Sequence, residues 1–451
     1  MAKYKAYPEY KDSGVEWLGK IPNHWTTLAI KHVAQLNPSK SCIGIEKMKG
    51  MCSFIPMEKL KFNSLCLDEI KDVTDVYNGY TYFENEDILI AKVTPCFENK
   101  NMVVAHDLNN GIGFGSSEIY VLRCNDIINN DFLFYRLQED NFMSIAEGAM
   151  TGAGGLKRVP SEVLNNFKFG LPSKKEQSII VDFLKHETAK IDKLIEKQQQ
   201  LIELLKEKRQ AVISHAVTKG LNPDVPMKDS GVEWLGDVPA HWQALPTKRL
   251  FRLVAEPAEI NNDYELLSVY TAIGVAPRKD LEPKGNKAST TDGYWKVRQG
   301  DIIVNKLLAW MGAVGFSNYD GVTSPAYDIL RKVKDINPKF YHYLFRLELT
   351  QREFKRWSRG IMEMRLRLYF EELGRIIMPV PPREEQDVIV EEIEKIEYQY
   401  SQLENIASHQ IDLLRERRTA LISAAVTGKI DVREWVAPNT QDIEESQEAT
   451  A

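Results

Sequence analysis

Residues 171–220 read LPSKKEQSIIVDFLKHETAKIDKLIEKQQQLIELLKEKRQAVISHAVTKG, and residues 380–429 read VPPREEQDVIVEEIEKIEYQYSQLENIASHQIDLLRERRTALISAAVTGK. The two stretches align along their whole length, with prolines, a Glu-Gln pair and an Ala-Val-Thr triplet at matching places. In each stretch one position recurs every seven residues: Leu184, Ile191, Gln198, Leu205 and Val212, then Ile393, Tyr400, Ala407, Leu414 and Leu421. This spacing is typical of long amphipathic helices that pack on another helix.

In the first stretch Leu194 and Leu201 take the interleaved position, and Ile195 and Ile202 widen the apolar face. Pro172 and Pro381–Pro382 lie at or just before the expected helix starts, and Gly220 and Gly428 follow the expected helix ends, as helix start and stop signals do. We therefore expect two helices of about 45 residues that pack against each other along the face with the seven-residue spacing, which we call the seam. An antiparallel arrangement is expected because it keeps the polar seam residues of one copy away from the equivalent positions of the other. The alternative is two unrelated amphipathic helices, each packed on its own domain.

A second repeat lies upstream of each helix. Residues 11–25 read KDSGVEWLGKIPNHW, and residues 228–242 read KDSGVEWLGDVPAHW. Together the repeats indicate a tandem duplication of a unit of about 210 residues. The segments between them share only short matches, EDILIAK (86–92) with GDIIVNK (300–306) and SSEIYVLR (116–123) with SPAYDILR (324–331). A shared frame around dissimilar middles suggests one architecture that carries two different specificities.

The middle segments contain short β-branched stretches bounded by Gly, Asn and Pro, with a few helices such as 129–148 and 337–357. The predicted fold class is α+β, with two mixed α/β domains separated by two long helices that form an antiparallel coiled coil, and internal pseudo-symmetry. The predicted segments are a repeat arm (1–25), a mixed domain (26–172), a long helix (173–219), an arm and linker (220–242), a mixed domain (243–381), a long helix (382–429) and an acidic, disordered tail (430–451).

Composition narrows the class of protein. Of 451 residues, 43% are hydrophobic and 27% are charged, which fits a folded globular chain. No apolar run approaches the roughly 20 residues of a membrane span, and the N-terminus lacks a signal-peptide core. We therefore expect a cytoplasmic chain without a membrane partner. The irregular spacing of the five cysteines predicts reduced thiols rather than disulfides or zinc ligands: Cys42, Cys52, Cys66, Cys96 and Cys124.

Catalytic motifs are absent from the sequence. It has no Walker lysine motif, no HExxH and no GxSxG. The glycines of GIGFG (111–115) and GAGG (152–155) do not open a helix after a strand, so we expect loops there rather than a nucleotide site. These absences predict a chain without catalytic residues, metal or cofactor of its own.

Basic residues gather in both middles. REFKRWSRGIMEMRLRL (352–368) is rich in arginine, and its counterpart AEGAMTGAGGLKRVP (146–160) holds a basic pair after glycines. Arg and Lys beside Ser, Thr and Asn suit phosphate positioning and base-edge hydrogen bonding, although a charge run is also typical of a solvated face. The predicted DNA-binding residues are Lys92, Asn99, Lys100, Ser116, Ser117, Thr151, Lys157, Arg158, Lys306, Ser324, Arg356, Arg359, Arg365 and Arg367.

The order of repeated arms, divergent middles and long helices resembles the specificity subunits of type I restriction–modification systems. LPSKKEQ and VPPREEQ at the helix starts and KRQAVISHAVTKG and RRTALISAAVTGK at their ends carry the resemblance. It implies that each middle is a target-recognition domain for half of a split, asymmetric double-stranded DNA target. It also implies that the helices act as a spacer and dock two methyltransferase subunits, with restriction–translocase subunits outside them. S-adenosylmethionine, ATP and Mg²⁺ would then be bound by those partners.

The sequence has two alternative interpretations. A self-contained DNA-modifying enzyme would require the catalytic motifs that the sequence lacks. A coiled-coil scaffold without nucleic acid would explain the helices but not why the duplicated middles diverged. The net charge of −6 neither favours nor excludes DNA, because binding depends on where basic groups cluster.

Overall fold

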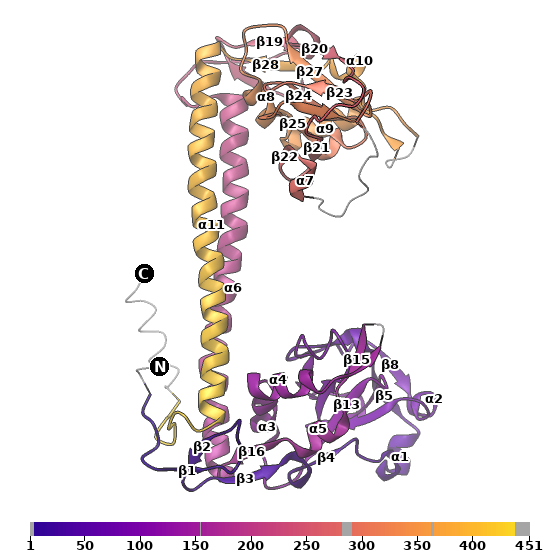
Figure 1. The fold of residues 1–451 in the computed structure, drawn as a ribbon, viewed down its shortest axis with the longest axis vertical. Coiled ribbons are helices and arrows are strands. Elements are labelled where there is room, and N and C mark those ends of the chain that lie inside the picture. The colour runs from indigo at the N-terminus through magenta and orange to yellow at the C-terminus, as the bar shows by residue number, and fades with distance from the viewer. Residues whose placement is uncertain (1–3, 154, 282–290, 362–364, 438–451) are drawn as a thin grey trace. The chain divides into compact units, whose positions relative to one another are not determined.

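The structure is a computed structural model that describes residues 4–153, 155–281, 291–361 and 365–437 (Figure 1). It divides into two units. Unit 1 comprises Met1–Lys197 and Gln410–Ala451, and unit 2 comprises Gln198–His409. Each unit contains one mixed domain and one half of both long helices, so each is considered by itself. The tail predicted as acidic and disordered comprised residues 430–451, of which those beyond 437 lie outside the described residues. Its first residues are folded, because Ile430 and Val432 are buried in the core of unit 1 and Trp435 packs against that core.

The two long helices predicted from the seven-residue spacing are present. Helix α6 spans Lys174–Lys219, and helix α11 spans Arg383–Val426. The Ser173 hydroxyl accepts the Glu176 N–H at the start of α6. Gly220 and Gly428 follow the helix ends with φ of 82° and 74°, a left-handed conformation that favours glycine.

Within each unit the two helices run antiparallel, as predicted. In unit 1 Asp192 on α6 pairs with Arg418 on α11 at 3.0 Å, and the earlier Phe183 contacts Trp435, which lies beyond the end of α11. In unit 2 Arg209 pairs with Glu404 at 3.3 Å. Further along α6 in the same unit, Val217 shares a core with Ile389 and Val390, near the start of α11.

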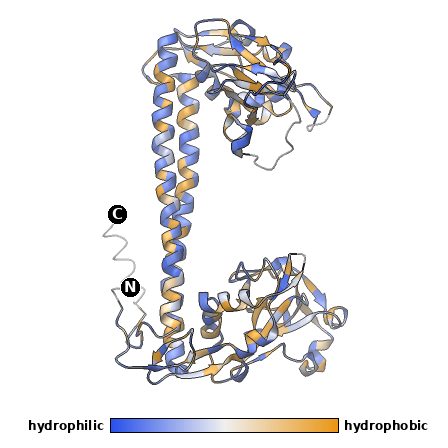
Figure 2. Cartoon of the chain, viewed as in Figure 1, coloured by the Kyte–Doolittle hydropathy of each residue, from blue (hydrophilic) through white to orange (hydrophobic). Residues whose placement is uncertain are grey.

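The interleaved seam position was predicted wrongly. Leu194 and Leu201 are 48% and 44% exposed, whereas Ile195 and Ile202 are partly buried. The buried face of α6 therefore continues from Ile191 to Ile195, four residues later, and not to Leu194, three residues later. Both offsets lie on one side of a helix, and the sequence alone did not distinguish them. Hydrophobic and hydrophilic residues alternate along both long helices (Figure 2).

Unit 1 builds its mixed domain from a four-stranded antiparallel sheet in the order β11-β10-β13-β4 and a second sheet in the order β8-β5-β12-β9. Helices α3 and α4 contribute Phe132, Leu133 and Phe142 to the core that the first sheet shares with α6. The elements are β1 (Tyr10–Asp12), β2 (Lys20–Pro22), β3 (Thr26–Ala29), β4 (Ala34–Leu36), α1 (Ile45–Met48), β5 (Met51–Ile55), β6 (Leu60–Lys61), β7 (Ser64–Leu65), β8 (Ile70–Asp72), α2 (Val73–Val76), β9 (Thr81–Glu84), β10 (Ile88–Ala91), β11 (Met102–Val104), β12 (Ile112–Gly115), β13 (Ile119–Cys124), α3 (Asn130–Leu137), α4 (Asp140–Gly148), β14 (Thr151–Ala153), β15 (Leu156–Arg158), α5 (Ser161–Asn166) and β16 (Lys168–Leu171).

The GIGFG segment, predicted as a loop, is the buried strand β12, and Thr151–Ala153 of the second glycine segment is strand β14. A Cβ on Gly113 would lie 2.3 Å from the Phe83 ring, and a Cβ on Gly115 would lie 2.8 Å from the Ile55 carbonyl oxygen. These glycines therefore permit close packing across a sheet, which a search for loop signals does not separate from a turn.

Unit 2 contains the corresponding antiparallel sheet, in the order β20-β27-β24-β25. Helices α8 and α9 contribute Phe340, Leu344 and Phe354 to the core beside it. The elements are β17 (Met227–Asp229), β18 (Asp237–Pro239), β19 (Gln243–Pro246), β20 (Phe251–Val254), β21 (Leu267–Tyr270), β22 (Gly274–Pro277), α7 (Arg278–Leu281), β23 (Trp295–Val297), β24 (Ile302–Asn305), β25 (Val314–Phe316), β26 (Gly321–Thr323), β27 (Tyr327–Lys332), α8 (Pro338–Phe345), α9 (Glu348–Trp357), α10 (Phe370–Leu373) and β28 (Ile377–Val380).

The Glu-Gln pair at the start of each long helix makes equivalent contacts in both copies of the repeated unit. In unit 1 Glu176 binds His24 of the arm at 2.9 Å, and the Gln177 side-chain oxygen accepts the N–H of Asn129, which precedes α3. In unit 2 Glu385 binds His241 at 2.7 Å, and Gln386 accepts the N–H of Asn337. The start of each long helix thus fixes an arm and a domain helix, a structural role.

Two further expectations concern cysteines and membranes. Cys52, Cys66, Cys96 and Cys124 carry free thiols. Among the helices that the structure describes, none combines the length and the apolar character that crossing a bilayer requires.

Candidate nucleic-acid interface

Residues from the short sequence matches shared by the two middle segments link neighbouring strands. In each unit an arginine binds a buried aspartate, and we call this pair the clamp. In unit 1 Arg123 on β13 makes two hydrogen bonds, of 2.8 and 2.7 Å, to the carboxylate of Asp87 just before β10. In unit 2 Arg331 on β27 binds Asp301 in the same way, at 2.9 and 2.8 Å. These paired hydrogen bonds raise the arginine pKa above its ordinary value in both units. The shared matches therefore preserve the sheet and not a reactive group.

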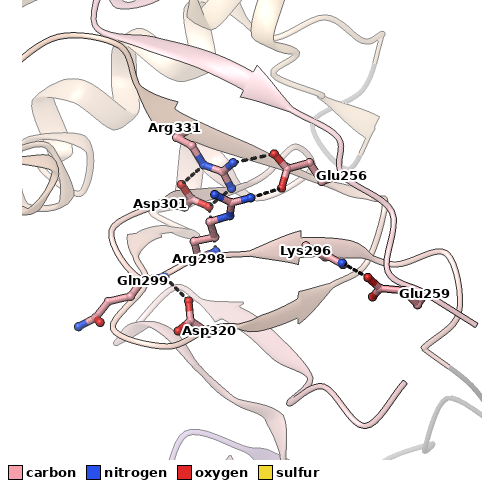
Figure 3. Close-up of polar contacts among 8 residues, drawn as sticks. All are labelled: Glu256, Glu259, Lys296, Arg298, Gln299, Asp301, Asp320 and Arg331. Atoms are coloured by element: carbon pink, nitrogen blue, oxygen red, sulfur yellow. Dashed lines mark hydrogen bonds and ion pairs between the residues drawn. The ribbon is translucent and has the colours of Figure 1, made fainter. Parts of the chain in front are cut away.

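Unit 2 extends this clamp into a larger ionic network (Figure 3). The Glu256 carboxylate accepts one hydrogen bond from Arg331, at 2.8 Å, and another from Arg298, at 3.1 Å. The backbone N–H of Arg298 donates to Asp301 at 2.9 Å. Four charged groups of alternating sign thus neutralise one another, which leaves this part of the domain poorly suited to attract phosphate.

The lysines at the ends of the central strands are also paired. Lys92 lies 4.0 Å from Glu118 and 5.1 Å from the centre of the Tyr120 ring. Lys306 binds Asp328 at 3.0 Å, and its side chain is only 20% exposed. Both lysines were predicted to contact DNA. The structure places Lys92 beside Glu118, directly before β13, and Lys306 beside Asp328 on β27.

The predicted serines begin matching turns. Ser116 accepts the N–H of Glu118 at 3.2 Å, and Ser324 accepts the N–H of Ala326 at 3.3 Å. Ser117 is exposed between Ser116 and Glu118. These turns carry Glu118 and precede Asp328, so they lie beside the strand-end lysines in both units.

Next to each strand-end lysine the chain forms an antiparallel hairpin, which we call the glycine hairpin (residues 151–153 with 155–158 in unit 1, and 359–361 with 365–367 in unit 2). In unit 1 β14 pairs with β15, and Thr151 lies opposite Arg158. In unit 2 Arg359 and Arg367 exchange two backbone hydrogen bonds of 2.9 Å. The residue after each hairpin donates its N–H to the carbonyl of the strand-end lysine, at 2.9 Å in both units.

The second residue of each glycine hairpin is a glycine that no other residue can replace without strain. Gly152 has φ of 147°, and a Cβ there would lie 2.2 Å from the Leu156 carbonyl oxygen. Gly360 has φ of 154°, and its Cβ would lie 2.6 Å from the Arg365 carbonyl oxygen. The same backbone geometry thus recurs in two segments of dissimilar sequence.

The predicted cations of the hairpins and of α9 differ in their surroundings. Arg158 makes two hydrogen bonds to Glu118, Arg356 lies 3.6 Å from Glu353, and Arg359 forms an ion pair with Glu372. In contrast, the exposed side chains of three cations make no ion pair or hydrogen bond with any residue that the structure describes: Lys157, Arg365 and Arg367.

Asn99 and Lys100, also predicted to bind DNA, lie in a different place. They line a cavity of about 390 Å³ whose other wall includes Asp192 of α6 and Arg418 of α11. The Lys100 ammonium donates to the Gln138 carbonyl at 2.8 Å. The structure therefore does not bring these two residues to the glycine hairpin.

Sequence reasoning missed Thr94, which lies two residues after Lys92 and contacts the hairpin of unit 1. Its hydroxyl donates to the Gly155 carbonyl at 2.8 Å and accepts the Lys157 N–H at 3.0 Å. No periodicity or motif marks this threonine in the sequence. Within the described ranges, no group of three or more His, Cys, Asp or Glu residues is placed to hold a metal ion.

Comparison with known proteins identifies the architecture. Residues 22–204 match the family model described as the type I restriction modification DNA specificity domain. The specificity subunit of the Escherichia coli type I restriction enzyme EcoAI is 35% identical over 213 residues, which cover 45% of this chain and 35% of that protein. The EcoEI specificity subunit of the same organism is 31% identical over 196 residues, covering 41% and 32%. The matched segments thus span about a third of these relatives.

Solved structures share the fold. A chain from a structure of complex assembly and conformational transition in a type I R-M system superposes with a TM-score of 0.67 at 13% identity, covering 91% of this chain and 99% of that one. The HsdS subunit of Thermoanaerobacter tengcongensis superposes with a TM-score of 0.55 at 14% identity, covering 91% and 98%. These similarities show that the chain shares the fold of these structures.

Proposed function

We infer that this chain is a type I specificity subunit, and we propose that it reads a split, asymmetric double-stranded DNA target for a restriction–modification enzyme. One observation carries the proposal. Both units repeat the same clamp, strand-end ion pair and glycine hairpin, while the residues around them differ. Two domains of one architecture with different surfaces suit the reading of two different half-sites.

We assign residues 26–172 and 243–381 as the two target-recognition domains and propose that the pseudo-symmetry of the chain follows from the duplicated unit. Because both readers belong to one chain, binding of the first half-site raises the effective concentration of the second. The reach of the long helices would then fix the number of base pairs between the half-sites.

In this proposal the chain itself performs no catalysis and acts in the cytoplasm. Methylation and cleavage are supplied by methyltransferase and restriction–translocase subunits, which bind S-adenosylmethionine, ATP and Mg²⁺. The scaffold and self-contained enzyme hypotheses gain no support from the structure, since neither accounts for the duplicated clamp and hairpin.

Exposed leucines on the long helices support the docking of two identical subunits. Leu194 on α6 and Leu403 on α11 occupy equivalent positions of the two copies, and both are 48% exposed. Leu204 and Leu413 form a second equivalent pair, 61% and 50% exposed. Apolar side chains that recur on a helix surface without facing the seam are typical of a protein interface, and their duplication favours two copies of one methyltransferase subunit.

The proposal is tested by expressing the chain with its methyltransferase subunit in a host that lacks the system, followed by methylome sequencing. We expect methylated adenines in one split motif whose two halves differ. A host methylome that does not change when the chain is added or deleted would contradict the proposal, and would favour a scaffold without DNA recognition.

A further inference from the structure

We propose that the glycine hairpins are the elements that enter the DNA major groove, with Lys157 reading one half-site and Arg365 and Arg367 reading the other. This inference rests on the proposed function and makes it specific. It divides the predicted DNA-binding residues into those that contact bases and those that hold the hairpin in place.

The shape of the hairpin fits the ligand. A two-stranded antiparallel ribbon is one of the two elements that the major groove of B-DNA admits, at a width of about 12 Å. In unit 1 both arms of the hairpin are exposed along their length, and Leu156 near the tip is 47% exposed. Val159, directly after the second arm, donates its N–H to the carbonyl of Lys92 at the end of the central strand β10.

Ion pairs with carboxylates determine which cations of the hairpin are available to bind DNA. The carboxylate of Glu118 binds the Arg158 guanidinium at 3.0 and 2.9 Å and lies 4.0 Å from the Lys92 ammonium. The hydrogen bonds from Arg158 hold the Glu118 pKa below its usual range, so this carboxylate stays charged. Arg158 and Lys92 would have to break these pairs to reach DNA, whereas the neighbouring Lys157 has none to break.

Unit 2 shows the same division with different residues. Arg359, on the first arm, pairs with the carboxylate of Glu372 on α10. Arg365 and Arg367, on the second arm, extend from the ribbon without a described partner. Lysine and arginine both pair with the O6 and N7 acceptors of guanine, and arginine can do so with two hydrogen bonds.

Thr94 is a positioning residue for the hairpin of unit 1. Its hydroxyl bridges Gly155 and Lys157, and its own N–H donates to the Lys157 carbonyl at 3.0 Å. Thr94 therefore donates two hydrogen bonds and accepts one, and together these bonds fix the backbone that carries the Lys157 side chain. In unit 2 the position two residues after the strand-end lysine is Leu308, which cannot form the side-chain bonds, and the Arg359–Glu372 pair holds the hairpin instead.

The experiment uses the full chain purified with its methyltransferase subunit and a library of random duplex DNA, with binding to the enriched motif measured across a salt series. We expect Lys157→Ala to lower affinity for the wild-type motif by about 10- to 100-fold and to relax one position of one half-site. Arg365→Ala combined with Arg367→Ala should relax the other half-site alone. Lys168→Ala, which removes an exposed charge from β16 of unit 1, is the matched control and should keep the wild-type motif.

Positioning by Thr94 is tested in the same assay. Thr94→Val should degrade the half-site that Lys157 reads, and Thr94→Ser, which keeps the hydroxyl, should restore it. Melting temperatures of all variants, expected to stay near that of the wild type, separate this effect from unfolding.

The outcomes distinguish the possible failures. If the wild-type complex enriches no motif, the proposed function itself fails. If it enriches a motif that the Lys157 and arginine variants share at wild-type affinity, the hairpins do not read DNA. A uniform loss over all sequences with a smaller salt dependence would assign these cations to phosphates and overturn their role in base reading.

Discussion

Arg136 on α3 is fully buried and pairs with Glu139 at 3.0 Å, among Trp17, Phe167 and other aromatic rings. Burial lowers the pKa of Arg136, while the Glu139 charge opposes that change. The equivalent positions in unit 2 are Leu344 and Leu347, which are 0% and 1% exposed. The duplication therefore offers an apolar replacement for a buried ion pair within the same architecture.

We expect Arg136→Leu to destabilise unit 1 by about 3–5 kcal/mol, because the buried Glu139 carboxylate loses its cation. The double variant Arg136→Leu with Glu139→Leu should recover most of that loss, since it reproduces the pair found in unit 2. Hydrogen exchange of α3 and α4 in the full chain measures both changes. A double variant as unstable as the single one would show that the leucines cannot pack in unit 1.

We expect His342 on α8 to make the stability of unit 2 depend on pH. Its Nδ1 accepts the Phe316 N–H at 3.2 Å, and burial, with the positive charges of Arg346 and Lys339, lowers its pKa to about 3. The same pocket contains Glu394 and Glu397, which bind Lys339 and Tyr343. An unfolded histidine takes up its proton near pH 6.5. Between these values the unfolded chain therefore holds more protons, and stability falls as pH falls below about 6.5.

Unfolding of the wild type and of His342→Gln between pH 7.5 and pH 5 tests this dependence. The wild type should lose up to about 1.4 kcal/mol per pH unit more than the variant toward the acidic end, because glutamine keeps a hydrogen-bond acceptor but takes up no proton. Parallel pH profiles for the two proteins would show that His342 is not responsible.

The sequence predicted which segments hold the basic residues, but not which residues are free to act. Lys157 and Arg158 are adjacent and equally suited to DNA by residue type. They differ because Glu118, some 40 positions earlier in the chain, reaches Arg158 only after the sheet has formed. Partners that distant in sequence are set by tertiary packing, which residue type and spacing do not reveal.

At the scale of elements, the long helices were predicted because a seven-residue spacing over 46 residues leaves few alternatives. The assignment of Leu194 and Leu201 to the seam failed, because both offsets from Ile191 satisfy helical spacing. Strand β12 was missed for a related reason. Its glycines resemble a loop until the Phe83 ring that packs on Gly113 is seen.

The exposed leucines that the seam leaves outside yield a prediction for subunit docking. Leu194→Ser and Leu403→Ser should each weaken the binding of one methyltransferase copy by about 10- to 100-fold, because each loses the burial of one leucine. Both side chains are about half exposed, so stability should change by less than about 0.5 kcal/mol.

Native mass spectrometry at saturating partner checks this prediction. The wild type should carry two copies, each single variant one, and the double variant none. Lys193→Ser and Gln402→Ser, at the adjacent equivalent positions, are the matched controls and should retain two copies. A wild-type complex with a single copy at saturation would contradict the duplicated docking surface.

For the molecule as a whole, the net charge of −6 would limit the attraction of DNA to the chain in the proposed function. Binding to duplex DNA usually depends on several cations that neutralise phosphates, and most of the predicted cations here are paired with carboxylates. We therefore attribute sequence reading to a few unpaired cations on the hairpins and much of the phosphate attraction to the partner subunits. Specificity and affinity would then reside in different chains of one complex.

If the long helices set the distance between half-sites, lengthening them should change the spacer and nothing else. The change is seven residues inserted after Lys197 of α6 and seven after His409 of α11, where the two units divide. A full heptad in each helix keeps the seam in register and adds about 10 Å at 1.5 Å per residue. One base pair rises about 3.4 Å, so the preferred spacer should grow by about three base pairs with both half-sites unaltered.

The same seven residues inserted after Asp224, in the exposed turn that follows α6, are the control and should leave the spacer as it is. Methylome sequencing of hosts carrying each variant decides the matter, because the original spacer methylated at full efficiency by the lengthened helices would show that they do not measure the target.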